Sequence, residues 1–147
     1  ESAQIAYNWV RSRYAQIGFD PSILDSNDVH VHVPAGATPK DGPSAGTAIA
    51  TAVASLLSGR AVKPYLSMTG KITLRGRVLT VGGIKEKVLA ASRAGVRHIL
   101  LPETNRSDLA EDVPREIAET ITFHLVSDAL EVVEWAVEPK SEEQSDA

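Results

Sequence analysis

The sequence predicts an α+β fold built as one domain. Two observations carry this prediction: segments with helical and strand periodicity are interleaved along the chain, and neither an internal repeat nor a second domain is visible. The 147 residues are enough for one domain with its own core. We expect that domain to cover residues 1–137 and the polar, acidic stretch 138–147 to form a disordered tail.

The first part of the chain predicts two helices and a strand. Apolar residues recur at helical spacing over residues 2–17, and a glycine follows that is suited to end the helix. Residues 28–33 read Asp-Val-His-Val-His-Val, the two-residue period of a strand. Two prolines and two glycines make 34–42 a loop, and a proline at its end suits the first turn of a helix that runs to Gly59.

The second part continues the alternation of strands and helices. The region 64–81 predicts two strands joined by a turn at Arg75-Gly76, because short apolar runs flank that pair. The elements expected after it are a helix over Ile84–Ala94 ended by Gly95, a strand over His98–Leu101, short helical pieces over 107–119, a strand over 121–126, and a helix capped by Ser127 that reaches Ala136.

Composition narrows the functional classes. The formal net charge is −4, so nothing draws the whole molecule to nucleic acid or to an anionic membrane. No apolar run approaches the ~20 residues of a membrane span. The absence of cysteine excludes disulfides and thiol catalysis, and is compatible with the cytoplasm.

One serine is the leading candidate for chemistry. Residues 42–46 read Gly-Pro-Ser-Ala-Gly, which matches the Gly-x-Ser-x-Gly nucleophile elbow of α/β-hydrolases. That elbow needs a strand running straight into the turn, whereas a loop intervenes here. Asp108 or Asp112 with His124 has the chain order of the remaining triad members. A Ser-His-Asp esterase is therefore one alternative for Ser44.

A serine–lysine pair asks less of the sequence. A lysine removes a proton from a serine hydroxyl only when its amine is neutral, so its usual pKa of about 10.4 must be lowered. Ser44 precedes a helix, where about half a positive charge accumulates and favours an oxyanion over an ammonium group. Two lysines compete for the role of base. Lys87 shares a helix face with small alanines, whereas Lys85 is expected to be more solvated, which favours Lys87 modestly.

Several ordered motifs carry a family resemblance. They are His-Val-His-Val-Pro at 30–34, Gly-Ala-Thr-Pro-Lys-Asp-Gly-Pro-Ser-Ala-Gly at 36–46, Met-Thr-Gly-Lys-Ile-Thr-Leu-Arg-Gly at 68–76 and Gly-Gly-Ile-Lys-Glu-Lys at 82–87. With them, the chain resembles the C-terminal proteolytic domain of Lon, the ATP-dependent protease also called endopeptidase La. The similarity covers nearly all of residues 1–137.

The resemblance implies roles for individual residues. Ser44 would be the nucleophile and Lys87 the general base, with Thr69 orienting the lysine by a hydrogen bond. Asp41 would lie in a loop that switches the site between open and occluded forms. The sequence departs from the family at Lys71, where an acidic residue is usual, and this puts any salt bridge or ring contact of that position in doubt.

The resemblance also implies the setting of the domain. Its fold would be similar to ribosomal protein S5 domain 2, and six copies would form a ring around a proteolytic chamber. An AAA+ module, absent from this sequence, would bind ATP and Mg²⁺ and feed unfolded polypeptide to the site. No cofactor or metal is expected in this chain. The alternative is a ring-forming Lon-like module without catalytic activity.

A histidine pair raises the question of a metal site. His30 and His32 alternate on the expected strand, so both would project from one face. No carboxylate or third histidine follows at ligand spacing, which favours a structural role over a metal site.

Overall fold

Mixed helices and strands make up the protein, as the sequence predicts. The computed structural model describes residues 1–32 and 42–139. The helices are α1 (Ser2–Ser12), α2 (Tyr14–Ile17), α3 (Gly46–Ser58), α4 (Ile84–Arg93), α5 (Arg106–Asp112), α6 (Arg115–Ala118) and α7 (Ala129–Ala136), and the short 3₁₀ segments are η1 (Pro21–Asp25), η2 (Gly42–Ala45) and η3 (Glu103–Asn105). The strands are β1 (Leu66–Met68), β2 (Lys71–Ile72), β3 (Val78–Leu79), β4 (His98–Pro102) and β5 (Thr122–Val126). None of the described helices is long and apolar enough to cross a membrane.

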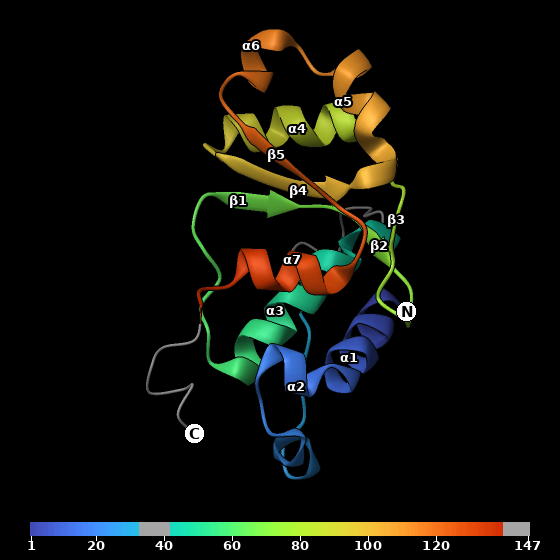
Figure 1. The fold of residues 1–147 in the computed structure, drawn as a ribbon, viewed down its shortest axis with the longest axis vertical. Coiled ribbons are helices and arrows are strands. Elements are labelled where there is room, and N and C mark those ends of the chain that lie inside the picture. Colours follow the sequence, from blue (N-terminus) through green and yellow to red (C-terminus); the bar gives the residue numbers. More distant parts are fainter. Residues whose placement is uncertain (33–41, 140–147) are drawn as a thin grey trace.

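A small parallel sheet divides the molecule into two layers of helices. Its strand order is β1-β4-β5, so β1 lies at one edge, and Ser67 pairs with Ile99 in the parallel register. Helices α4, α5 and α6 lie on one side of this sheet, and α1, α3 and α7 on the other (Figure 1). Because strand side chains alternate between faces, the buried side chains of β4 serve both layers.

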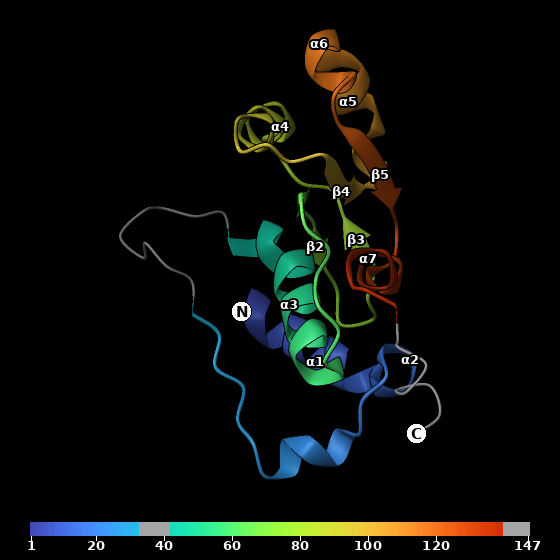
Figure 2. The ribbon, with the colours of Figure 1, turned by 90° about the vertical axis from the view of Figure 1, so that its left-hand side faces the viewer.

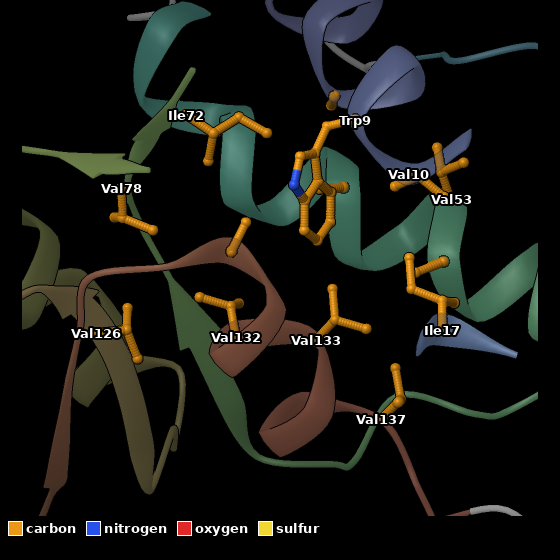
Figure 3. Close-up of a cluster of buried hydrophobic side chains, with 14 of the residues drawn as sticks. Trp9, Val10, Ile17, Val53, Ile72, Val78, Val126, Val132, Val133 and Val137 are labelled. Atoms are coloured by element: carbon orange, nitrogen blue, oxygen red, sulfur yellow. The ribbon is translucent and has the colours of Figure 1, made fainter. Parts of the chain in front are cut away.

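The larger core cluster lies on the side of α1, α3 and α7. Leu100 and Val126 from the sheet reach into it, and the fully buried Trp9 lies at its centre (Figure 3). A second cluster fills the space between the sheet and the α4–α5 layer, with Ile99 and Leu101 on the sheet side and Val88 on α4. The sheet is therefore covered by apolar side chains on both faces.

A short antiparallel hairpin of β2 and β3 closes the larger cluster. Ile72 pairs with Val78, and the turn contains Gly76 at φ 91°, so the predicted turn at Arg75-Gly76 is confirmed. A Cβ at Gly76 would lie 2.3 Å from the indole nitrogen of Trp9. Positive φ and this close approach both require glycine here.

Most predicted helix ends are confirmed, with two corrections. Helix α1 ends at Ser12, because Arg13 leaves helical geometry at φ −109° before the short α2 resumes. Gly18 then ends α2 in the left-handed conformation, as expected. The last helix is capped by Asp128 rather than Ser127, because Asp128 and Glu131 form a reciprocal capping box.

The strand predicted over residues 28–33 is wrong for the part that the structure describes. Residues 28–32 form no strand and pair with no other segment among the described ranges, although their alternation is clear. A strand exists only through hydrogen bonds to a neighbour, so periodicity alone does not create it. Residues 33–41, with most of the predicted loop, lie outside the described residues.

Candidate active site

A cavity of about 500 Å³ lies between the first turns of α3, the edge strand β1 and helix α4. In Figure 2 the start of α3 and helix α4 lie on the same side of the molecule. Apolar side chains line most of the cavity, and the polar or charged side chains among its lining residues are Ser44, Ser67, Thr69 and Lys87. An apolar cavity with a few convergent polar groups is the usual form of a binding or catalytic site.

Ser44 enters the cavity wall from η2, directly before α3. It is 8% exposed, and the 13-residue helix α3 begins two residues later. The amide of Gly70 donates a hydrogen bond to the Ser44 carbonyl at 2.9 Å, and the amide of Thr47 donates to the Gly70 carbonyl at 3.0 Å. These two bonds join the serine's backbone to the strand segment that carries Thr69. The serine thus lies at the positive end of a helix dipole.

Close backbone approach explains the glycine that follows Thr69. A Cβ on Gly70 would lie 2.9 Å from the Thr47 side chain and 3.0 Å from that of Val78. The same approach involves Gly46, whose added Cβ would lie 3.1 Å from the amide nitrogen of Ile72. The two glycines let η2 and the start of α3 pack directly on the hairpin backbone.

Lys87 enters the cavity from the opposite wall. It lies in α4, whose N-cap Gly83 has φ 71°, and it is half-buried. Its amine donates a hydrogen bond to the hydroxyl of Thr69, with 3.1 Å between Nζ and Oγ1. Lys85 of the same helix is exposed and does not line this cavity. The two lysines therefore lie on different faces of α4, and Lys85 is the more exposed of the two, as the sequence pattern indicated.

Thr69 is held in place before it contacts the lysine. Its backbone amide donates to the carbonyl of Leu100 in β4 at 3.1 Å, and the residue is 8% exposed. Its hydroxyl is therefore presented from a fixed strand end rather than from a loop. Thr69, Ser44 and Lys87 come from three separate elements and meet at one cavity.

Two other residues were singled out with the family resemblance, Asp41 and Lys71. Asp41 is outside the described residues. Lys71 lies in β2 and lines a different cavity together with Glu1. No salt bridge of Lys71 exists within the described ranges. Lys71 therefore does not contribute to the cavity that holds Ser44.

The structure does not assemble the Ser-His-Asp alternative. His124 lies on β5, where its ring contacts Trp135 at 4.1 Å between centroids and shares a 3.1 Å contact between ring nitrogens with His98. Burial, then the nearby positive groups of His98 and Lys63, lower the pKa of His124. His124 is not among the residues lining the Ser44 cavity.

The two aspartates of that alternative do not line the Ser44 cavity either. Asp108 accepts a hydrogen bond from the buried Asn105 at 2.7 Å, and both Asp108 and Asp112 border a different cavity. His30 and His32 are exposed, and no group of three potential metal ligands occurs within residues 1–32 and 42–139.

Sequence reasoning did not identify the edge strand as part of the site. Leu66, Ser67, Met68 and Thr69 all line the cavity, although neighbouring strand residues point to opposite faces. The cavity therefore lies against the edge of β1 and not against one of its faces. The only sequence signal was the position of these residues directly before Thr69.

Comparisons with known proteins identify the family of this chain. The family model of the Lon protease (S16) C-terminal proteolytic domain matches residues 1–139. A Lon protease of Salinispora arenicola is 50% identical over 95% of this chain, which corresponds to 18% of that relative. Lon protease 1 of Bacillus subtilis is 52% identical over 93% of the chain and 18% of the relative. The same comparison with Desulfovibrio desulfuricans Lon protease gives 53% identity over 96% of the chain and 16% of the relative.

These matches cover most of this chain but a small part of each relative. The chain spans between 15% and 18% of the length of the curated relatives it matches. Within that part, the motifs around Ser44, Thr69 and Lys87 fall inside the matched residues. The chain belongs to the Lon protease family, to its C-terminal proteolytic domain.

Proposed function

We propose that this chain is the peptide-cleaving part of an ATP-dependent serine protease, with Ser44 as nucleophile and Lys87 as general base. The observation that carries the proposal is the Lys87–Thr69 hydrogen bond of 3.1 Å in the wall of the cavity that Ser44 also lines. Family membership supports the same assignment. Thr69 is proposed to position the lysine, and Asp41 to belong to the loop that opens or occludes the site.

The chemistry requires one proton acceptor that acts twice. The neutral amine of Lys87 removes the proton of the Ser44 hydroxyl while the serine oxygen forms a bond to the carbonyl carbon of the substrate. The resulting ammonium gives its proton to the leaving amine as the C–N bond breaks, which leaves an acyl-enzyme. The amine then takes a proton from water while the water oxygen attacks the ester carbonyl. As the ester C–O bond breaks, the ammonium returns that proton to the serine oxygen, which releases the acid and restores both Ser44 and the neutral Lys87.

Two features of the site assist these steps. The dipole of α3 places positive potential at Ser44, which favours the anionic tetrahedral intermediate. The Thr69 hydroxyl accepts one N–H of Lys87 and so restricts the directions that its lone pair can take. Most of the cavity lining is apolar, so few side chains compete with Ser44 and Thr69 for hydrogen bonds to the amine.

The edge of β1 offers a way to hold the substrate backbone. In a parallel pair, the N–H and C=O of one residue point to the same side, and those of the next residue to the other. The amide of Thr69 and the carbonyl of Tyr65 bind β4, so the backbone groups of Leu66 and Met68 point to the open edge. An extended polypeptide adding to this edge would run past Ser44.

Family membership supports a proposal for the wider assembly. An AAA+ module in the full-length protein would bind ATP and Mg²⁺, unfold protein substrates and deliver them to a homo-hexameric ring. We also propose that the fold is similar to that of ribosomal protein S5 domain 2. We further propose that the domain covers residues 1–137 and that residues 138–147 form a tail. The cytoplasm stays a prediction for its location.

Cleavage of a fluorogenic unstructured peptide tests the proposal. We expect Ser44→Ala and Lys87→Ala each to reduce turnover at least about a thousandfold, because a nucleophile and its base act as one unit. Lys85→Ala is the matched control on the same helix and should keep wild-type activity. A folded Ser44→Ala variant that still cleaves the peptide would refute the assignment. An active wild type beside folded but inactive Ser44→Ala and Lys87→Ala variants would argue against the alternative of a ring-forming module without catalytic activity.

A further inference from the structure

Tyr65, directly before β1, has an unusual backbone conformation. It is the only non-glycine residue with positive φ in the described ranges, at φ 60°. This region is uncommon for a bulky side chain and costs free energy unless surrounding contacts impose it. Tyr65 is nevertheless 62% exposed, so burial in the core does not explain the conformation.

Hydrogen bonds explain how the conformation is held. The Tyr65 carbonyl accepts hydrogen bonds from the amides of Arg97 at 2.8 Å and His98 at 3.1 Å, which fixes its peptide group directly before the first pair of the β1–β4 ladder. With its backbone fixed in this way, the residue projects its ring into solvent beside β1.

The guanidinium group of Arg97 lies over the exposed ring of Tyr65. The central carbon of the Arg97 guanidinium lies 5.2 Å from the centroid of the Tyr65 ring, a cation–π distance. No salt bridge of Arg97 occurs within the described part of the chain, and Arg97 itself is exposed. Its hydrogen-bond donors are thus oriented by an aromatic surface while no carboxylate of the described residues occupies them.

The pair lies directly beyond one end of the candidate active site. The cavity follows the chain from Thr69 back along β1 to Leu66, and on the opposite wall it follows α4 from Lys87 and then the turn after α4, at Ala94 and Val96. Tyr65 is the next residue after Leu66 along this edge, and Arg97 the next after Val96. At about 3.3 Å per strand residue, Tyr65 lies about 13 Å along the edge from Thr69.

We infer that Tyr65 and Arg97 form an outer subsite that binds an acidic side chain of an extended polypeptide substrate, about four residues from the bond that is cleaved. This inference rests on the proposed function, because it takes the edge of β1 as the substrate track. An extended substrate advances at the same rise as β1, so four residues separate the dyad from the pair. The planar guanidinium suits a carboxylate, and the tyrosine ring packs against the aliphatic part of the same side chain.

Binding to the inactive chain tests the subsite separately from the chemistry. In a Ser44→Ala background, fluorescence anisotropy would compare variants of one unstructured host peptide. The variants carry Glu, Gln or Lys at successive positions, up to six residues on either side of the bond that the Ser44 form cleaves or, if it cleaves none, of the central bond. We expect a preference of about three- to tenfold for Glu over Gln at one position near the fourth residue, the range for a partly solvated charge-assisted hydrogen bond.

The same comparison with Arg97 variants identifies the residue responsible. The preference should vanish in Arg97→Gln and shrink in Arg97→Lys, which keeps the charge but loses the planar fork. Three outcomes would each overturn the subsite: no preference for Glu when Arg97 is intact, a preference that survives Arg97→Gln, or no peptide binding at all. A Glu preference that depends on Arg97, in a chain whose Ser44 form cleaves nothing, would support the subsite and count against the proposed protease activity.

Tyr65→Gly separates a binding role from a structural one. Glycine adopts positive φ freely, so the melting temperature should be unchanged or higher. Peptide binding and the Glu preference should both weaken, because the ring that orients Arg97 is lost. A lower melting temperature with unchanged peptide preference would assign Tyr65 a structural role and overturn its part in the subsite.

Discussion

Replacing Thr69 by valine would remove one hydrogen bond and almost nothing else. Valine has nearly the same shape, and the site of substitution is only 8% exposed, so packing should persist. The lost contact is the 3.1 Å bond that the Thr69 hydroxyl accepts from the Lys87 amine. Thr69→Val would therefore test positioning of the proposed base without removing either proposed catalytic residue.

The size of the effect follows from the surroundings of that amine. An N–H left without its partner costs about 1–3 kcal/mol when it is buried, and the half-buried Lys87 amine falls in the lower part of that range, at about 1–2 kcal/mol. If that cost falls on the arrangement needed in the transition state, kcat falls by about 5- to 30-fold. The KM for the peptide should change little, because Thr69 contacts the lysine and is not proposed to bind the substrate side chain.

Steady-state cleavage of a fluorogenic peptide, with thermal unfolding of each variant, provides the measurement. Thr69→Ser is the matched control, since it keeps the hydroxyl and should retain kcat within about threefold of the wild type. Wild-type kcat in Thr69→Val would refute the positioning role. Equal losses in the serine and valine variants would instead indicate that the methyl packing of Thr69 matters, and not its hydroxyl.

Two further predictions concern stability. The fully buried side chain of Asn105 accepts a hydrogen bond from the Val81 amide at 3.1 Å and donates one to the Val81 carbonyl at 2.8 Å. Asn105→Ala should therefore lower the free energy of unfolding, measured by urea denaturation, by about 2–5 kcal/mol. A loss below about 1 kcal/mol would contradict this. Burial, His98 and Lys63 lower the pKa of His124 from 6.5, so the unfolded state binds its proton more readily. Stability should therefore be fully present above pH 6.5 and decline as the pH falls through 6.5, and His124→Gln should flatten that slope; an equal slope in both proteins would refute it.

The sequence predicts best those features that depend on local chemistry. Gly18 and Gly59 end helices in the left-handed conformation, Gly76 turns the hairpin, and Gly95 follows α4 at φ 78°. Each of these residues is suited to its place by the absence of a Cβ, which is visible without any knowledge of the fold. The capping residue of α7 is missed by one position, because Ser127 and Asp128 are both good caps and the capping box with Glu131 decides between them.

Pairing between distant segments is not readable in the same way. The alternation over residues 28–32 is as regular as that of a strand, yet no described segment pairs with it. Conversely, β1 has only three residues and little alternation, and its parallel pairing with β4 makes it a strand. Its place at the edge of the sheet, beside the cavity, depends on that pairing and could not be predicted.

The candidate site shows the same division. Ser44 and Lys87 stand in long motifs, so the residue types and their order along the chain are informative by themselves. Tyr65 and Arg97 belong to no motif, because their relation arises only when β1 and β4 align. Contacts across elements depend on the three-dimensional pairing of those elements, which no single motif encodes.

The backbone bonds around Gly70 make the candidate site observable without a substrate. The Gly70 amide is held by the Ser44 carbonyl, and the Thr47 amide by the Gly70 carbonyl. Breaking the contact between η2 and the strand segment would release both amide hydrogens to solvent exchange at once. Matched exchange rates for these two amides would report how often η2, with Ser44, separates from the segment that holds Thr69 and Gly70, in solution and without substrate.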